Sequence, residues 1–253
     1  AITTGGDNTA VGSGALATED GNGQNVAVGS AALATLNAGA DAGNVAVGYQ
    51  ALTAATTGVD NVAVGFQAGD ALTTGSDNTI IGDGAGGAIT TGSDNIAIGS
   101  AALDAVTTAS NNIAIGSNAL GANTSGTDNV AIGDSAGDAI TTGNDNTAIG
   151  DNALSANTTS NNNTAVGSSA LLVNTAASNT AVGYLSMYAN TTGTENVAVG
   201  KSALAANTTA EANTAIGFNT LAANTTGHSN VAIGKDALDS NTTANHNIAI
   251  GVD

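Results

Sequence analysis

One pentapeptide recurs along the whole chain and constrains its fold more than any other feature. It reads Asn, then Thr, Val or Ile, then Ala (Ile in one copy), then Val or Ile, then Gly. Twelve of its fourteen intervals are 17 residues long, and the other two are 19 and 16. A period this short and regular predicts a stacked repeat, in which each unit covers the open edge of its neighbour. The copies begin at Asn8, Asn25, Asn44, Asn61, Asn78, Asn95, Asn112, Asn129, Asn146, Asn163, Asn179, Asn196, Asn213, Asn230 and Asn247.

We number each repeat from its Asn as position 1. Positions 2 and 4 hold β-branched residues in every copy, and position 5 is always Gly. This period-two alternation predicts a short strand with positions 2 and 4 on one face. The Gly at position 5 ends the strand. A helix is disfavoured, because each interior Gly would destabilise it by about 1 kcal/mol.

The predicted fold class is all-β, a parallel β-solenoid of about fifteen 17-residue coils. Strands of successive coils would pair in a ladder with a spacing of about 4.8 Å. Because the repeat occupies residues 1–253, we expect one solenoid domain, a rod of about 70 Å. Neither Ala1 nor Asp253 belongs to a capping segment, which favours end-to-end continuation or a longer fibre.

The pattern also predicts which side chains form the core. Positions 2, 4 and either 9 or 12 carry medium apolar side chains and are the predicted core. Position 3 is Ala in all copies but one, on the opposite face of the strand. A row of Ala favours close packing against another chain, for example at Ala97, Ala114 and Ala131. The alternative is a very narrow coil whose opposite wall contacts this row.

Positions 9 and 12 compensate for each other in size in most copies, with exceptions at Leu33 with Leu36 and at Leu103 with Val106. Leu120 at position 9 occurs with Asn123 at position 12, whereas Gly86 occurs with Ile89. We infer that the two positions point into one pocket near a corner, where a cavity would destabilise the fold by a few kcal/mol.

Asparagine recurs at two positions. At position 1 it predicts a ladder of amides bonded along the stack, as in cross-β structures, with an outward polar row as the alternative. At position 12 it precedes Thr-Thr or Thr-Ser and matches the acceptor for N-glycosylation, although an Asn- and Thr-rich repeat produces this string by chance. The candidate acceptors are Asn123, Asn157, Asn190, Asn207, Asn224 and Asn241.

Charge excludes several function classes. The formal net charge is −18, and Lys201 and Lys235 are the only strong bases. Nucleic-acid binding requires a cationic face, which is missing, and an anionic membrane surface is disfavoured for the same reason. No apolar run is long enough for membrane insertion. The acidic, Lys-poor, Asn- and Thr-rich composition predicts an extracellular, cell-surface or virion-surface location.

Strings that resemble catalytic motifs fall where the repeat places its small residues. The stretch 133–137 matches a nucleophile elbow, which requires a strand-to-helix turn with His and acid partners. His228 and His246 lie in predicted turns and are interpreted as solvated. The acids at position 17, such as Asp77 and Asp94, are interpreted as turn residues rather than calcium ligands. We therefore predict no enzyme activity, catalytic residue, cofactor or metal site.

Aromatic residues are rare and concentrate at one position. Tyr49, Phe66, Tyr184 and Phe218 all occupy position 6, which is otherwise mainly Ser, Asp or Lys. This variability predicts an outward position. We interpret the rings as scattered surface residues, with contacts to a neighbouring chain or ligand as the alternative.

The run Asn-Val-Ala-Ile-Gly, found at 129–133 and 230–234, resembles the head repeats of trimeric autotransporter adhesins. It is also similar to repeats of phage tail fibres. The resemblance covers essentially the whole chain. It implies a left-handed parallel β-roll, three chains in a bundle, and a place on a cell or virion surface. The adhesin repeat is shorter, however, and lacks the Asn-Thr-Thr-Gly stretch.

The sequence thus favours an extracellular structural protein that forms a fibre or fibre segment through contacts with copies of itself. The alternative is an adhesin head or a phage-fibre shaft that binds a host surface or glycan. Ice binding is disfavoured, because the adjacent threonines of each repeat would point to opposite faces of a strand.

Overall fold

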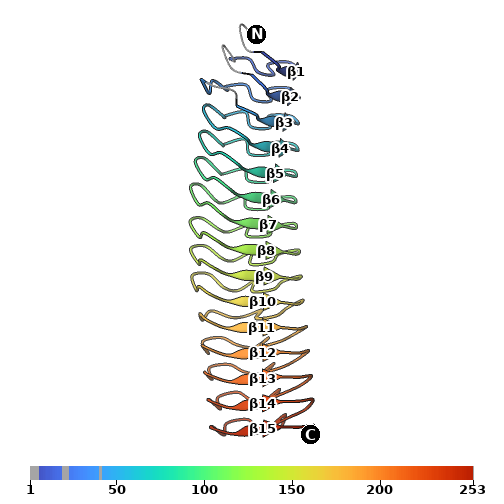
Figure 1. Ribbon diagram of the computed structural model, residues 1–253, viewed down its shortest axis with the longest axis vertical. Coiled ribbons are helices and arrows are strands. Elements are labelled where there is room, and N and C mark those ends of the chain that lie inside the picture. The colour runs from blue at the N-terminus through green and yellow to red at the C-terminus, as the bar shows by residue number, and fades with distance from the viewer. Residues whose placement is uncertain (1–5, 19–22, 40–41, 253) are drawn as a thin grey trace. The chain divides into compact units, whose positions relative to one another are not determined.

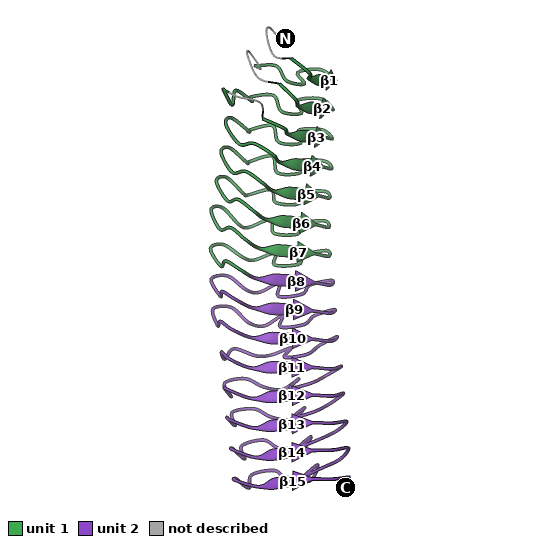
Figure 2. Cartoon of the chain, viewed as in Figure 1, with its two compact units in different colours: residues 1–128 green, residues 129–253 purple. Residues whose placement is uncertain are grey.

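The computed structural model describes residues 6–18, 23–39 and 42–252, so Ala1 and Asp253 lie outside the described part of the chain. Two compact units divide it, residues 1–128 and 129–253 (Figure 2). Each strand occupies positions 2 to 4 of one repeat (Figure 1). None of the described residues forms a helix suited to crossing a membrane.

Unit 1 contains β1 (Thr9–Val11), β2 (Val26–Val28), β3 (Val45–Val47), β4 (Val62–Val64), β5 (Thr79–Ile81), β6 (Ile96–Ile98) and β7 (Ile113–Ile115). Unit 2 contains β8 (Val130–Ile132), β9 (Thr147–Ile149), β10 (Thr164–Val166), β11 (Thr180–Val182), β12 (Val197–Val199), β13 (Thr214–Ile216), β14 (Val231–Ile233) and β15 (Ile248–Ile250).

Within each unit the strands pair in parallel and in register. Ile96 pairs with Ile113 and its backbone N–H donates to the carbonyl of Asn112 at 2.8 Å. The two irregular intervals leave this register unchanged, since Val26 pairs with Val45 and Thr164 with Thr180. The two irregular lengths therefore do not alter the pairing of the strands. The predicted all-β parallel β-solenoid with a 17-residue repeat is confirmed.

A second line of contacts joins the coils at position 13. The hydroxyl of Thr73 donates to the carbonyl of Thr90 at 2.9 Å, and Thr90 does the same to Thr107 at 2.9 Å. Their backbone N–H groups donate to the same carbonyls at 2.8 Å. The Thr at position 13 therefore links successive coils by hydrogen bonds on a part of the coil that has no strand.

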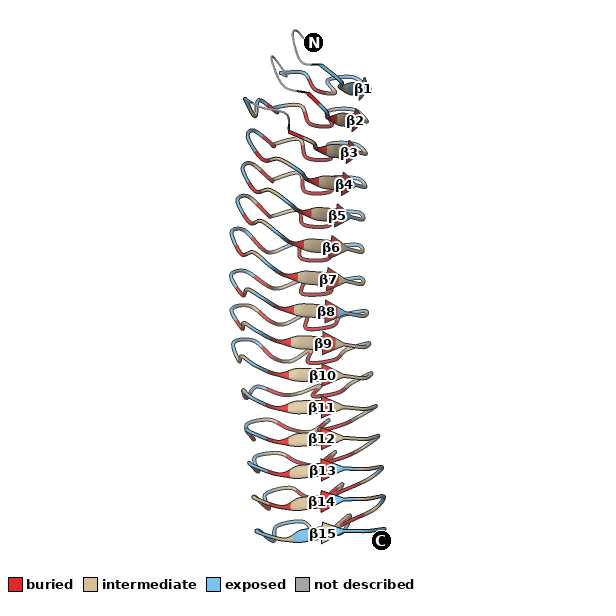
Figure 3. Cartoon of the chain, viewed as in Figure 1, coloured by how far each residue is buried: buried red, intermediate tan, exposed pale blue. Residues whose placement is uncertain are grey.

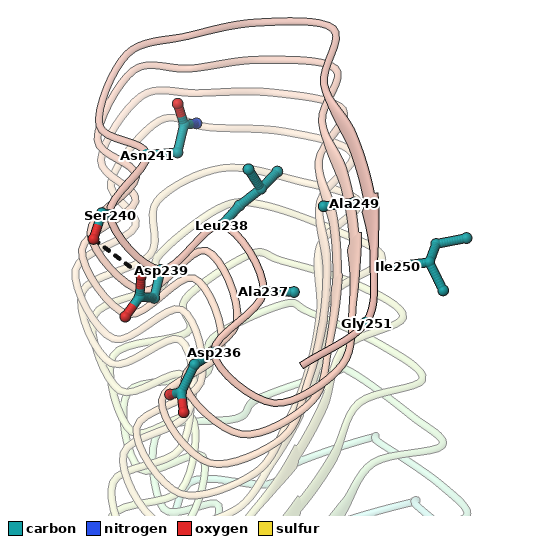
Figure 4. Close-up of a pocket in the computed structure, with 9 residues that line it drawn as sticks. All are labelled: Asp236, Ala237, Leu238, Asp239, Ser240, Asn241, Ala249, Ile250 and Gly251. Atoms are coloured by element: carbon teal, nitrogen blue, oxygen red, sulfur yellow. Dashed lines mark hydrogen bonds between the residues drawn. The ribbon is translucent and has the colours of Figure 1, made fainter. Parts of the chain in front are cut away.

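The inside of each coil is lined by small residues, not by the β-branched ones. From β2 to β14, position 3 is buried and positions 2 and 4 are half-buried or exposed (Figure 3). Figure 4 shows the same arrangement in the last strand, where Ala249 points into the coil and Ile250 points away from it. The prediction that positions 2 and 4 belong to the core is therefore wrong. The coil is too narrow for larger side chains at position 3, because Ala at position 8 and Leu at position 9 already fill its interior. Ala102 and Leu103, for example, are both fully buried.

The one large residue at position 3 shows how tight this interior is. Ile80 is fully buried, and its two neighbours at position 9 are Gly69 and Gly86. A Cβ atom at Gly69 would lie 2.8 Å from Cδ1 of Ile80, and one at Gly86 would lie 3.3 Å from it. The same Cβ at Gly86 would lie 3.0 Å from Cδ1 of Ile89 at position 12. This confirms that positions 9 and 12 share a pocket in that coil, and it adds position 3 as a third contributor.

The corners are made by residues in the left-handed backbone region. In one stretch Leu103, Asn111 and Asn118, at positions 9, 17 and 7, have φ values of 56°, 62° and 54°. Asn and Asp tolerate this region, whereas Leu is destabilised there by about 1–2 kcal/mol. Leu103 is fully buried, so the apolar surface it removes from water offsets that strain.

Enlarging position 3 should destabilise a coil that lacks the compensating glycines. Ala114 lies between Leu103 and Leu120 at position 9, and all three are fully buried. We expect Ala114→Ile to lower the free energy of unfolding by about 1–3 kcal/mol, because the core becomes overpacked. Urea unfolding followed by circular dichroism measures this loss. The same Ile at the exposed Ser117 is the control and should change stability by less than about 0.5 kcal/mol. Equal effects at the two positions would contradict the narrow interior.

Candidate functional surfaces

The Asn at position 1 forms the ladder that the sequence predicted. The Oδ1 atom of Asn95 accepts the backbone N–H of Asn112 at 3.0 Å, and Asn78 accepts that of Asn95 at 3.1 Å. The Nδ2 atom of Asn95 donates to the carbonyl of Ala109 at 3.0 Å, three residues before the Asn that begins the next repeat. Asn95 is fully buried. This side chain therefore bonds to the coils on either side and also closes its own coil.

A second asparagine ladder occupies position 12 in unit 2. Asn190 donates from Nδ2 to Oδ1 of Asn174 at 2.6 Å, and Asn207 donates to Asn190 at 2.7 Å. Asn224 and Asn241 continue the row at 3.2 and 3.1 Å. Each of these amides from Asn190 onward also donates to the carbonyl three residues later. Coils with Leu or Ile at position 12 do not take part in this ladder. Position 12 therefore carries either an apolar side chain or an amide that bonds along the stack.

The candidate glycosylation sites are members of this buried row or equivalent to it. Asn123, Asn157, Asn190, Asn207 and Asn224 are fully buried, and Asn241 is half-buried. An N-linked sugar attaches to Nδ2, but these atoms donate hydrogen bonds inside the coil, as Asn123 does to the carbonyl of Gly126 at 3.1 Å. The five buried side chains are therefore inaccessible to glycosylation in the folded chain. The sequence could not show this, because the acceptor string carries no information about the face on which it lies.

The Ala row predicted to contact another chain is also internal. Ala97, Ala114 and Ala131 are fully buried within their own coils. They cannot touch a partner chain, and the narrow-coil alternative is the correct account of position 3.

The surface available for such a contact is the outer face of the strands. Positions 2 and 4 form two parallel rows of Val, Ile and Thr without a single charged residue. Val64, Ile81, Ile132 and Ile233 are each 36% exposed. Regular exposed apolar rows of this kind mark contact surfaces more often than isolated apolar residues do.

The residues at position 6 lie next to this face and form contacts that the sequence did not reveal. The rings of Tyr49 and Phe66 stack with centroids 5.3 Å apart and an interplanar angle of 15°. In unit 2, Nζ of Lys201 lies 5.9 Å from the ring centroid of Tyr184 and 5.7 Å from that of Phe218. These distances are within the range of cation–π attraction. The outward orientation predicted for position 6 is confirmed, but the rings are not scattered.

The two histidines lie in turns, as predicted, and their rings meet edge to face. The centroids of His228 and His246 are 5.2 Å apart with an interplanar angle of 88°. The backbone N–H of His228 donates to Oδ1 of Asn245 at 2.8 Å. The described residues contain no cluster of three or more metal-binding side chains.

One carboxylate lies in an unfavourable environment. Burial raises the pKa of Asp138, and the nearby Asp134 raises it further, although backbone hydrogen bonds act in the opposite direction. Its Oδ1 atom is buried without a hydrogen-bond partner. Burial likewise raises the pKa of Asp70, which occupies the same position 10 of its repeat.

The coil interior opens to solvent beside β15 (Figure 4). The opening has a volume of about 550 Å³, and Leu238 and Ala249 point into it. Its polar groups bond to close neighbours: Ser240 donates to Oδ1 of Asp239 at 3.0 Å, and Asn241 belongs to the position-12 ladder. The opening is therefore uncovered coil interior, and its polar groups do not converge on a common point.

Comparisons with protein-family models, with curated proteins and with solved structures find no match to this chain. Any functional conclusion therefore depends on the surfaces described above.

Removing one amide of the position-1 ladder should be costly for stability. In Asn95→Ala the N–H of Asn112 and the carbonyl of Ala109 lose their partner inside the coil. We expect the free energy of unfolding to fall by about 2–5 kcal/mol, because each unsatisfied buried group costs about 1–3 kcal/mol. Chemical unfolding measures the change. Ser100→Ala, at an exposed position outside the left-handed backbone region, should be nearly neutral, and a similarly small effect at Asn95 would refute the ladder's role.

Replacing Asp138 with a neutral residue should stabilise the chain relative to the wild type, and this advantage should grow as pH rises. Its folded-state pKa lies above the ordinary value, so the associated stability is present at low pH and is lost as pH rises through the folded pKa. Asp138→Asn should therefore gain stability over the wild type between about pH 3 and pH 7. Thermal unfolding across this range tests the difference. The exposed Asp83→Asn serves as control, and an advantage that shrinks with rising pH would contradict the burial effect.

Proposed function

We propose that this protein is an extracellular structural protein whose β-solenoid units associate side by side through the outer face of their strands to form a fibre or fibre segment. The observation that carries the proposal is the pair of uncharged β-branched rows at positions 2 and 4, repeated in every coil. The proposal keeps the lateral packing predicted from the sequence but assigns it to the opposite face of the strand.

A second copy of the chain is the partner that best fits this face. A partner that contacts each coil in the same way must repeat at the same interval as the coils, about 4.8 Å. Another copy has this interval by construction. The fit therefore continues from coil to coil without further adjustment.

Charge supports the same choice of face. Two chains of net charge −18 repel each other, and the repulsion is smallest where the surfaces in contact carry no charge. The strand face meets this condition along each unit, whereas positions 6, 10 and 17 carry acids in several coils. Burying the half-exposed Val and Ile side chains would then supply the favourable free energy, about 25 cal/mol for each Å² of apolar surface.

The runner-up function is an adhesin head or fibre shaft that binds a host surface. The observation that favours it is the cluster of exposed rings and lysines at position 6 in unit 2. The structural role is preferred because the strand face recurs in every coil, whereas this cluster occupies few of them.

A matched pair of variants tests side-by-side association. Ile98→Lys with Ile115→Lys places two charges on the strand face, and Ser100→Lys with Ser117→Lys places the same charges at position 6 of the same coils. We expect the wild type and the position-6 variant to associate in sedimentation velocity and to form filaments under the electron microscope. The strand-face variant should sediment as a monomer. A wild type that remains monomeric at high concentration would overturn the proposal.

A further inference from the structure

Both strong bases of the chain lie in one short column with two of its aromatic residues. Tyr184, Lys201, Phe218 and Lys235 occupy position 6 of four successive repeats in unit 2. The spacing between neighbours in such a column is about 4.8 Å. In a chain with a net charge of −18, this column concentrates all the positive side-chain charge on one small surface. We call these four residues the position-6 column.

The column is exposed and its members contact one another. Tyr184 is 51% and Phe218 is 46% exposed. The ammonium group of Lys201 lies between their rings, 5.9 and 5.7 Å from the centroids. The rings therefore hold the charge in a defined place, which lowers the conformational entropy that a ligand would have to remove on binding.

Lys235 extends the charge by one coil. Its Nζ atom lies 2.6 Å from Oδ2 of Asp236, and its side chain is 59% exposed. Asn219 donates to Oδ1 of the same carboxylate at 3.1 Å. An exposed ion pair of this kind contributes little net free energy, so Lys235 can turn to an external carboxylate at small cost.

We propose that the position-6 column binds an acidic oligosaccharide that carries one or two carboxylates. The exposed rings offer apolar surface to the C–H faces of sugar rings, and the ammonium groups of Lys201 and Lys235 pair with the carboxylates. Charge-assisted hydrogen bonds of this type are the strong ones. A nucleic acid is a poorer fit, because single-stranded binding needs a cationic groove that follows many phosphates. A highly charged polysaccharide is also disfavoured, because its charges beyond the position-6 column would meet an acidic surface.

Unit 1 provides a matched control. Tyr49 and Phe66 also occupy position 6, are 48% and 51% exposed, and stack on each other. No lysine accompanies them, because both lysines of the chain lie in the position-6 column. This pair therefore separates the effect of exposed rings alone from the effect of rings combined with charge.

The experiment compares sialyllactose, which carries one carboxylate, with neutral lactose, using calorimetry at a protein concentration below any self-association. We expect sialyllactose to bind the wild type at least fivefold more tightly than lactose, with an affinity that falls as salt is added. Lys201→Gln with Lys235→Gln should abolish that preference, Lys201→Arg should retain it, and Tyr184→Ser with Phe218→Ser should weaken binding at least fivefold. Tyr49→Ser with Phe66→Ser should leave binding unchanged.

Several results would overturn this inference. They are equal affinity for the two sugars, no binding of sialyllactose, retained preference in the double Gln variant, or an equal loss in the unit 1 ring variant. Unfolding temperatures of all variants identify any that fail to fold. The sedimentation behaviour of the strand-face variants reports on the proposed fibre separately, so the failure of one proposal is distinguishable from the failure of the other.

Discussion

The buried asparagine at position 1 supplies the interaction on which the rest of each coil depends. A strand of three residues is too short to hold a sheet together by itself. The amide of Asn95 accepts the N–H of Asn112 in the next coil and donates to the carbonyl of Ala109 near the end of its own repeat. One side chain thus satisfies backbone groups that would otherwise be buried without partners. The constant Asn at position 1 follows from this requirement.

Much of the fold follows from the sequence, because the repeat gives the strand positions, the parallel stacking and the ladder at Asn95 directly. The orientation of the strand does not follow, because a period-two pattern shows which residues share a face without showing which face is inside. The size of the side chains does indicate which face lies inside, because the nearly constant Ala at position 3 is what a narrow interior requires. The link between Ile80 and Gly69 was also hidden, since the two belong to different repeats and meet only when the coils stack.

The candidate surfaces were predictable to a lesser degree. The variability of position 6 correctly placed Tyr184 and Phe218 on the outside, but contact between residues of successive coils needs the stacking geometry as well as the sequence. At Asn190 and Asn207 the sequence motif was misleading. The string matches an acceptor for a surface modification, but both side chains belong to a buried ladder. In a repeat protein the register of a residue therefore says more about its role than the short motif around it.

The pairing of Ile80 with Gly69 and Gly86 has a consequence for how the chain finds its native arrangement. Coils that are nearly identical can pair with the wrong neighbour during folding, because a skipped repeat preserves almost every backbone bond. If the repeat that carries Gly69 were skipped, Ile80 would meet Leu52, the position-9 residue of the repeat before it, where even a single Cβ in place of Gly69 would lie only 2.8 Å from Cδ1 of Ile80. Ile80 and Gly69 thus favour the native alignment of their two repeats over an alignment that skips one repeat.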